Sequence, residues 1–163
     1  MIEIRPIQEH EVEDAKLVIF RVAYDIFKEG DTLEESIAKY SALGVLKDMD
    51  DVQKNYFEND GTFLVSVDDG RVIGTGAIRY MEEGVCELKR MWLLTEYHRH
   101  RLGYRMIQEL FSFARGKGYK LMRLKTDNAV QTRAVEFYKQ LGFYEIPTYE
   151  GDDPEDIAME LVL

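Results

Sequence analysis

Hydrophobic and polar positions along the chain follow two periods, one typical of strands and one typical of helices. Val85 to Leu93 is strand-like, and a short basic loop, His98 to Arg101, follows it. From Leu102 the apolar residues recur at helical spacing, in a stripe of Met106, Leu110 and Phe113 flanked by Ile107, Phe111 and Ala114. The pattern therefore predicts a strand, a basic loop and a helix, in that order.

The same reading predicts the other elements. Further strands are predicted at residues 2–7, 61–67, 71–80, 120–126, 143–146 and 157–163, and further helices at 9–28, 32–40, about 52–57 and 131–141. Pro6 marks an edge strand, Gly30 is the expected stop of the first long helix, and Thr32 with Glu35 forms a capping-box pattern.

The order of these elements predicts the topology. Asp68-Asp69-Gly70 is a tight-turn sequence, so strands two to four form an antiparallel meander. A helix separates residues 85–93 from 120–126, which favours a parallel pair with a helical crossover. We expect one α/β (α+β) domain over residues 1–163, with a mixed sheet of about six to seven strands and flanking helices.

Composition narrows the functional classes. The chain has 163 residues, 45% of them hydrophobic, and a formal net charge of -10, which argues against nucleic-acid binding and permits a cationic partner. No apolar run is long enough to span a membrane, and the single cysteine, Cys86, reads as a small buried residue of a cytoplasmic protein. His98 and His100 lack the companions of a metal site, so we expect none.

The basic loop and the helix that follows it suit an anion. The first amides of a helix have no partner within it, and Gly103 lets the backbone approach a ligand closely. Arg99, Arg101 and Arg105 add local positive charge to an acidic chain. The alternative is a solvated loop whose arginines pair with nearby glutamates.

Three segments together resemble the GNAT superfamily of acyl-CoA-dependent N-acetyltransferases. ELKRMWLLTEYHRHRLG is similar to its fourth strand and pyrophosphate loop, KLMRLKT to its fifth strand, and QTRAVEFYKQLGF to the following helix with its Ala-x-x-Phe-Tyr-x-x-Leu-Gly-Phe signature. Two positions depart from the family pattern: His98 stands for Arg or Gln, and Arg101 for the first loop glycine. A positive φ at Arg101 would cost about 1 kcal/mol or more.

The resemblance implies acetyl-CoA as cofactor and an amine as acceptor. The cofactor-binding residues it implies are Met91, Trp92, Leu93, His98, Arg99, His100, Arg101, Leu102, Gly103, Tyr104, Ala134 and Tyr138, with Asn128 or Gln131 as an amide contact. The pantetheine arm would add to the strand edge at Met91 to Leu93, and an amide near Leu93 would stabilise the oxyanion.

Tyr138 is the catalytic residue that the resemblance indicates most directly, as the acid that protonates the departing CoA thiolate. The alternative is a tyrosine that merely belongs to the apolar face of its helix. Glu87 would be the base, directly or through water, although water alone can serve. Strand periodicity places Glu87 on the face of Val85, Lys89 and Met91, so pairing with Lys89 is the other interpretation.

The implied reaction is transfer of an acetyl group to a primary amine of a small molecule, peptide or protein. An acid-rich rim, made of Glu29, Asp31, Glu34, Glu35, Glu150, Asp152, Asp153, Glu155 and Asp156, would attract a cationic acceptor, or is an ordinary solvated surface. A non-catalytic CoA-binding module is the alternative function. Trp92 and the many tyrosines suit a homodimer interface or simply a packed core.

Overall fold

The computed structural model describes residues 1–28, 32–127, 132–149 and 156–163. The strands are β1 (Ile2–Pro6), β2 (Thr62–Asp68), β3 (Arg71–Glu82), β4 (Val85–Leu93), β5 (Leu121–Asp127), β6 (Tyr144–Ile146) and β7 (Asp156–Val162). The α-helices are α1 (Val12–Phe27), α2 (Leu33–Ala42), α3 (Leu102–Gly116) and α4 (Thr132–Gln140). Short helical turns are η1 (Glu9–Glu11), η2 (Lys47–Asp51), η3 (Gln53–Phe57) and η4 (Thr95–His100).

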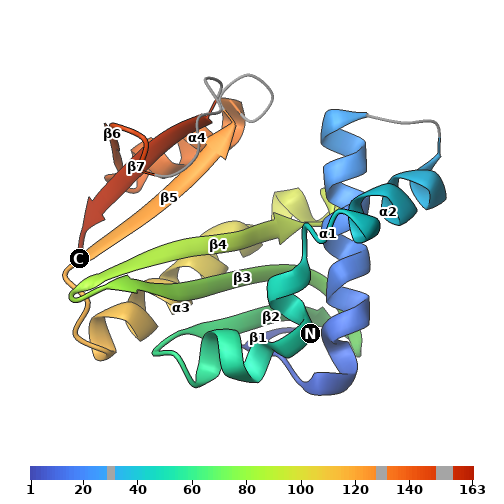
Figure 1. Cartoon of the computed structure of the whole chain (residues 1–163), viewed down its shortest axis with the longest axis horizontal. Coiled ribbons are helices and arrows are strands. Elements are labelled where there is room, and N and C mark those ends of the chain that lie inside the picture. The colour runs from blue at the N-terminus through green and yellow to red at the C-terminus, as the bar shows by residue number, and fades with distance from the viewer. Residues whose placement is uncertain (29–31, 128–131, 150–155) are drawn as a thin grey trace.

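The strands form one sheet in the order β1-β2-β3-β4-β5-β7-β6 (Figure 1). All neighbouring pairs are antiparallel except β4 and β5, which are parallel. The predicted mixed sheet, its antiparallel meander and its parallel pair are therefore confirmed. The capping box at α2 is seen in part, since the amide of Glu35 donates to Thr32 Oγ1 at 3.1 Å.

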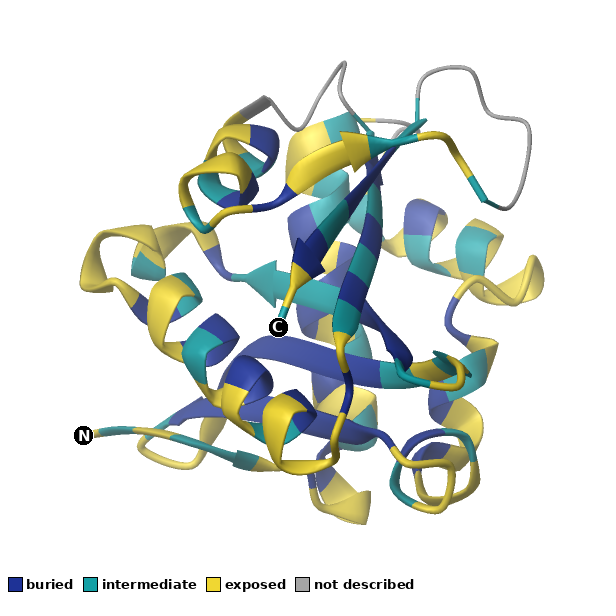
Figure 2. Ribbon diagram, turned by 90° about the vertical axis from the view of Figure 1, so that its left-hand side faces the viewer, coloured by how far each residue is buried: buried dark blue, intermediate teal, exposed yellow. Residues whose placement is uncertain are grey.

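Two hydrophobic clusters cover the two faces of the sheet. One joins α1, η2 and η3 to the inward side chains of β2 and β3, among them Phe63, Val65 and Ile73. The other joins α3 and α4 to the opposite face, with Leu64, Ile78 and residues of β4, β5 and β7. Because strand neighbours point to opposite faces, Leu64 enters one cluster while Phe63 and Val65 enter the other. Figure 2 shows the central strands buried between helices whose outer faces are exposed.

The parallel pair separates soon after it begins. β4 and β5 are in register only at Val85–Leu121, Cys86–Met122 and Glu87–Arg123, although β4 continues to Leu93 and β5 to Asp127. Figure 1 shows the two strands together at one end and apart at the other. From Leu88 onward, the β4 backbone groups that point away from β3 have no strand partner within the described part of the chain.

A β-bulge interrupts the second half of β4. Ala77 is opposite Lys89 and Thr75 is opposite Trp92, so Gly76 faces two residues, and the first of these, Arg90, has a φ of 58°. The extra residue reverses the alternation beyond it. The prediction that Met91 shares a face with Glu87 and Lys89 is therefore wrong: Met91 packs with Leu88 in the α3 cluster.

The first long helix differs from the prediction at both ends. The first long helix is a short η1 turn followed by α1, and it ends at Phe27 because Lys28 adopts a left-handed conformation, with φ of 50°. The expected stop, Gly30, lies outside the described residues. No helix within the described ranges combines the length and the hydropathy that crossing a bilayer requires.

Gly61 provides a test of packing at the start of β2. A Cβ built there would lie 2.2 Å from the Ile78 carbonyl oxygen, a backbone atom that cannot rotate away. We expect Gly61→Ala to destabilise the fold by about 3 kcal/mol, in the range of overpacked cores. Urea unfolding measures this, with Gly116→Ala as the control, because a Cβ at Gly116 meets nothing within 4 Å. Equal stability of the two variants would contradict the packing of Gly61.

Candidate active site

Two cavities open on either side of the diverging strands. One, of about 570 Å³, lies between α1, α2 and the ends of β4 and β5. The other, of about 1270 Å³, lies between β4, η4, α3 and α4. The four residues common to both linings are Tyr24, Met91, Trp92 and Tyr138. The cavities therefore meet where β4 leaves β5, beside the bulge.

The larger cavity brings together most of the residues predicted to bind the cofactor. Met91, Trp92, Leu93, His98, Arg101, Leu102, Gly103, Tyr104, Ala134 and Tyr138 all line it. Arg99 and His100 do not: both are exposed on η4. Asn128 and Gln131 lie outside the described residues. The cavity thus joins an open strand edge to the beginning of a helix.

The beginning of α3 presents backbone donors to this cavity. Leu102, Gly103 and Tyr104 form its first turn, and Arg105 is the first residue whose amide bonds back to Arg101, at 3.0 Å. Free amides and the positive end of a helix dipole can together bind an anion. The helix carries 15 residues, so the dipole is well developed.

Arg101 adopts the left-handed conformation that the sequence left open, with φ of 56°. Its guanidinium lies 5.3 Å from the ring centre of Tyr104 and lines the larger cavity. His98 contacts the carbonyl of Leu93 at 3.0 Å, and Arg105 donates to the carbonyl of Ile2 at 3.4 Å. Of the three arginines near this turn, Arg101 is the one whose side chain faces the cavity.

Tyr138 lies where the two cavities meet. Its ring packs 5.5 Å from those of Phe137 and Phe143, and its residue is only 8% exposed. The hydroxyl makes no hydrogen bond to a residue that the structure describes. Among the described residues, every fully buried polar side-chain atom has a partner, so this hydroxyl is not fully buried. It therefore faces the cavity. Burial raises the pKa of Tyr138 well above its ordinary value, so the phenol stays protonated at neutral pH.

Glu87 lines the smaller cavity, in an ion pair that the sequence did not indicate. Arg79, directly opposite on β3, donates to Oε1 at 2.8 and 3.2 Å, and the hydroxyl of Tyr149 donates to Oε2 at 2.6 Å. The alternative pairing with Lys89 is not formed. A carboxylate has about four acceptor sites, two on each oxygen, so Oε2 of Glu87 can still accept one more hydrogen bond.

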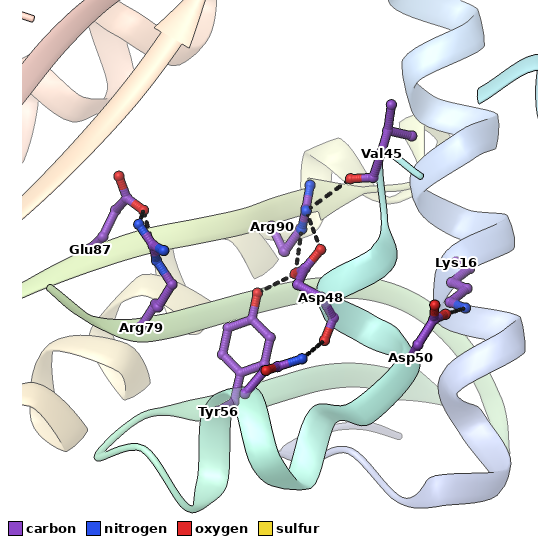
Figure 3. Close-up of polar contacts among 9 residues, drawn as sticks. Lys16, Val45, Asp48, Asp50, Tyr56, Arg79, Glu87 and Arg90 are labelled. Carbon is purple, nitrogen blue, oxygen red and sulfur yellow. Dashed lines mark hydrogen bonds and ion pairs between the residues drawn. The ribbon is translucent and has the colours of Figure 1, made fainter. Parts of the chain in front are cut away.

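The bulge in β4 is held by an ion pair that was not predicted. Arg90 donates to both carboxylate oxygens of Asp48, from Nε at 3.1 Å and Nη2 at 2.5 Å, and to the carbonyl of Val45 at 3.1 Å (Figure 3). Tyr56 donates its hydroxyl to the same carboxylate, and Thr75 Oγ1 donates to the Arg90 carbonyl at 2.6 Å. The left-handed residue is thus fixed from its side chain and its backbone.

One sequence signal does mark the bulge. Leu88 and Met91 are both apolar but three positions apart, an odd spacing that a regular strand would place on opposite faces. An extra residue between them restores a common face. The partner of Arg90 could not be found this way, because Asp48 lies 42 positions earlier.

Cys86 is buried, as predicted. Burial raises the pKa of its thiol to about 12, and its Sγ contacts the Leu121 carbonyl at 3.7 Å. It is inert at neutral pH because the thiolate is the reactive form. Within the described ranges, no three His, Cys, Asp or Glu side chains cluster as metal ligands.

The smaller cavity has an aromatic wall and a charged floor. Phe20, Tyr24, Phe27, Tyr40, Trp92 and Tyr138 contribute the wall, and Glu87, Lys89, Lys125, Asp127 and Asp156 lie among its charged lining residues. Of the predicted acidic rim, Asp156 belongs to this lining, Glu34 and Glu35 are exposed on α2, and the others lie outside the described residues.

The structure thus combines a sheet that splays at its parallel pair with a helix whose first turn lines the larger cavity. The chain matches the acetyltransferase (GNAT) family over residues 27–143. The protein therefore belongs to the GNAT family, as the sequence resemblance indicated.

Individual relatives and solved structures agree with this family. A protein named "Probable N-acetyltransferase camello" from Xenopus tropicalis is 32% identical over 100 residues, which is 60% of this chain and 45% of that protein. The chain thus spans less than half of that relative. PaiA N-acetyltransferase from Thermoplasma acidophilum, solved in complex with coenzyme A, has a TM-score of 0.78 at 23% identity, covering 100% of this chain and 99% of that one.

A second structural neighbour is closer in shape and more distant in sequence. An acetyltransferase from Streptococcus agalactiae has a TM-score of 0.82 at 19% identity, covering 99% of this chain and 98% of that one. Both neighbours therefore share the overall fold of this chain.

Asp48→Asn tests the ion pair at the bulge. Burial alone would raise the pKa of the Asp48 carboxyl, but the Arg90 hydrogen bonds and charge and the Tyr56 hydrogen bond outweigh burial and lower it. We expect the variant to lose about 3 kcal/mol of unfolding free energy at neutral pH, since it leaves a largely buried arginine without its counter-ion.

The loss should depend on pH with a definite sign. The pKa of Asp48 is lower in the folded protein than in the unfolded chain, where it is about 3.9. The stability that results is complete above the unfolded pKa and is lost as the pH falls through the folded pKa. Denaturant titrations should show a constant gap between wild type and Asp48→Asn down to about pH 4, and a shrinking gap below. Asp50→Asn, in an exposed pair with Lys16, should cost under about 1 kcal/mol.

Proposed function

We propose that the protein is an N-acyltransferase that moves an acetyl group from acetyl-CoA to a primary amine in a ternary complex. The observation that carries this proposal is the meeting of two cavities at Met91, Trp92 and Tyr138, beside the open edge of β4. One cavity can hold the thioester and the other the amine. Direct transfer needs this arrangement, because the two substrates must touch at one point.

Acetyl-CoA would occupy the larger cavity. Its pyrophosphate would bind the amides of Leu102 to Tyr104, with Arg101 adding positive charge. Its pantetheine arm would hydrogen-bond to the β4 edge that β5 leaves unpaired. The Thermoplasma acidophilum neighbour, which is in complex with coenzyme A, supports this choice of donor.

The reaction balances with the groups at the junction. The amine nitrogen bonds to the thioester carbonyl carbon, negative charge develops on the carbonyl oxygen, and a backbone amide of β4 near the bulge stabilises it. The carbon–sulfur bond then breaks, and Tyr138 donates its proton to the departing thiolate. The buried, inert Cys86 supports direct attack over an acyl-cysteine intermediate.

The proton released by the amine goes to Glu87, directly or through water, or to water alone. Glu87 lines the smaller cavity, where the amine would bind, and its carboxylate retains one acceptor site beside Arg79 and Tyr149. Its ion pair also fixes the side chain, so a water bound to it would be held at a defined position.

Tyr138→Phe separates catalysis from binding. It removes one hydroxyl that has no hydrogen bond in the described structure, so the fold and CoA binding should be retained. We expect kcat to fall about 100-fold or more, the usual contribution of a general acid. Thiol release from acetyl-CoA measures kcat, and calorimetry measures CoA binding. Tyr80→Phe, at an exposed tyrosine, is the matched control. Unchanged turnover in Tyr138→Phe would contradict the acid role, and no turnover in the wild type would favour a CoA-binding module.

Arg101→Ala tests how the pyrophosphate is held. If backbone amides supply most of the binding, removing this side chain should raise the Kd for CoA by no more than about 10-fold, the value of one partly screened charge contact. The effect should shrink at high salt. Arg99→Ala, at the exposed neighbour that does not line the cavity, should change Kd less. A loss of binding of 100-fold or more in Arg101→Ala would overturn the backbone model.

A further inference from the structure

Lys89 is a cation without a counter-ion in the acceptor cavity. It comes from β4, lines the 570 Å³ cavity and is half-buried. Its ammonium makes no hydrogen bond or ion pair with any residue that the structure describes. Burial and the charge of neighbouring Arg90 lower the pKa of Lys89, and together they outweigh the attraction of the Glu87 and Asp48 carboxylates, which raises it. Burying an unpaired charge is unfavourable, so such a group calls for an anion.

The two carboxylates whose charges act on Lys89 already accept hydrogen bonds from other side chains. Glu87, two residues earlier on the same strand face, receives hydrogen bonds from Arg79 and Tyr149. Asp48, the partner of the next residue along β4, receives them from Arg90 and Tyr56 (Figure 3). Both carboxylates are thus bound to arginines, and within the described residues Lys89 forms an ion pair with neither.

Other cations on this face of the sheet show the contrast. Arg79 pairs with Glu87, Arg90 with Asp48, and Arg123 with Glu82 and Glu160. The ammonium of Lys125 lies 5.5 Å from the ring centre of Tyr149. Among these residues of the described face, Lys89 alone points a charge into the cavity with nothing to bind it.

The position of Lys89 determines which part of a ligand it can reach. It precedes Met91, where the two cavities meet, by two residues, which is about 7 Å or less along the strand. A lysine side chain spans a similar distance. An anion bound by Lys89 therefore lies close to the atom that attacks the thioester, in a cavity whose volume suits a small molecule.

The rest of the wall selects an apolar body. Aromatic side chains from α1 and α2, including Phe20, Tyr24, Phe27 and Tyr40, face the same space. They offer contact area to a hydrophobic or aromatic side chain.

We propose that Lys89 binds a carboxylate of the acceptor, and that the acceptor is an α-amino acid, or an amino-acid derivative with free amine and carboxylate, that carries an apolar side chain. The proposal rests on the proposed function, since it names the substrate class of that site. The carboxylate on Lys89 would orient the neighbouring amine toward the thioester. Repulsion from the same ammonium would also favour the uncharged, reactive form of the amine.

Matched substrate pairs test this assignment. Thiol release from acetyl-CoA would be measured with L-phenylalanine and L-phenylalaninamide, and with L-leucine and L-leucinamide, for the wild type and for Lys89→Met. We expect Lys89→Met to lower kcat/KM for the free acids about 10- to 100-fold, mainly through KM, and for the amides less than about 3-fold. For each substrate, kcat/KM of the variant is divided by kcat/KM of the wild type. This ratio does not depend on the amine pKa, which differs between acid and amide.

Three controls separate the possible causes. Lys89→Arg keeps the charge and should restore most of the preference for the acids, and Lys89→Gln repeats the loss if Lys89→Met folds poorly. Lys54→Met, at an exposed lysine that does not line the cavity, should behave as wild type. Calorimetry with CoA should give the same affinity for every variant.

The outcomes are distinct. A selective loss of the free acids supports the proposal. Equal losses for acids and amides would make Lys89 a proton acceptor and overturn it, as would no loss at all, or a wild type that turns over amines without preferring the carboxylate. Failure of the wild type to bind CoA would instead overturn the proposed function, and the acceptor assignment with it.

Discussion

The early separation of β4 from β5 is the constraint on which the rest of this structure depends. Three residue pairs hold the two halves of the sheet together, and beyond them β4 has an unpaired edge. In a globular core such an edge would leave backbone donors and acceptors unsatisfied at a cost of about 1–3 kcal/mol each. Here the edge lies between two cavities, so a ligand or water can satisfy it. The same gap that weakens the sheet creates the site.

Strain accompanies this opening at two positions. Arg90 and Arg101, at the bulge and at the start of α3, both have a positive φ without being glycine. Each costs on the order of 1 kcal/mol, and surrounding interactions have to offset it. At Arg90 these are the bidentate pair with Asp48 and the bond from Thr75 to its carbonyl. At Arg101 the helix that begins at the next residue provides the support. In both places the unusual backbone lies where the proposed substrate would bind.

On the face of the sheet that lines the smaller cavity, the described arginines form ion pairs and Lys89 forms none. The ion pairs Glu87–Arg79 and Arg90–Asp48 hold side chains that line the smaller cavity, because each side chain is restricted to one conformation by its partner. Lys89, which lies between Glu87 and Arg90, is left facing the cavity. The net charge of -10 gave no indication of this, since a global excess of acid says nothing about which side chains find partners.

By itself the sequence determined the elements, the sheet and the general location of the site. Periodicity identifies β4 and α3, and the order strand, basic loop and helix predicts an anion site, because those signals come from neighbouring residues. Tertiary structure decided what depends on distant segments: that Arg90 pairs with Asp48, and that Glu87 accepts a hydrogen bond from Tyr149. Pairings across 42 or 62 positions leave no periodic trace. Lys89 forms no ion pair among the described residues, because the two carboxylates beside it, Glu87 and Asp48, are bound to Arg79 and Arg90.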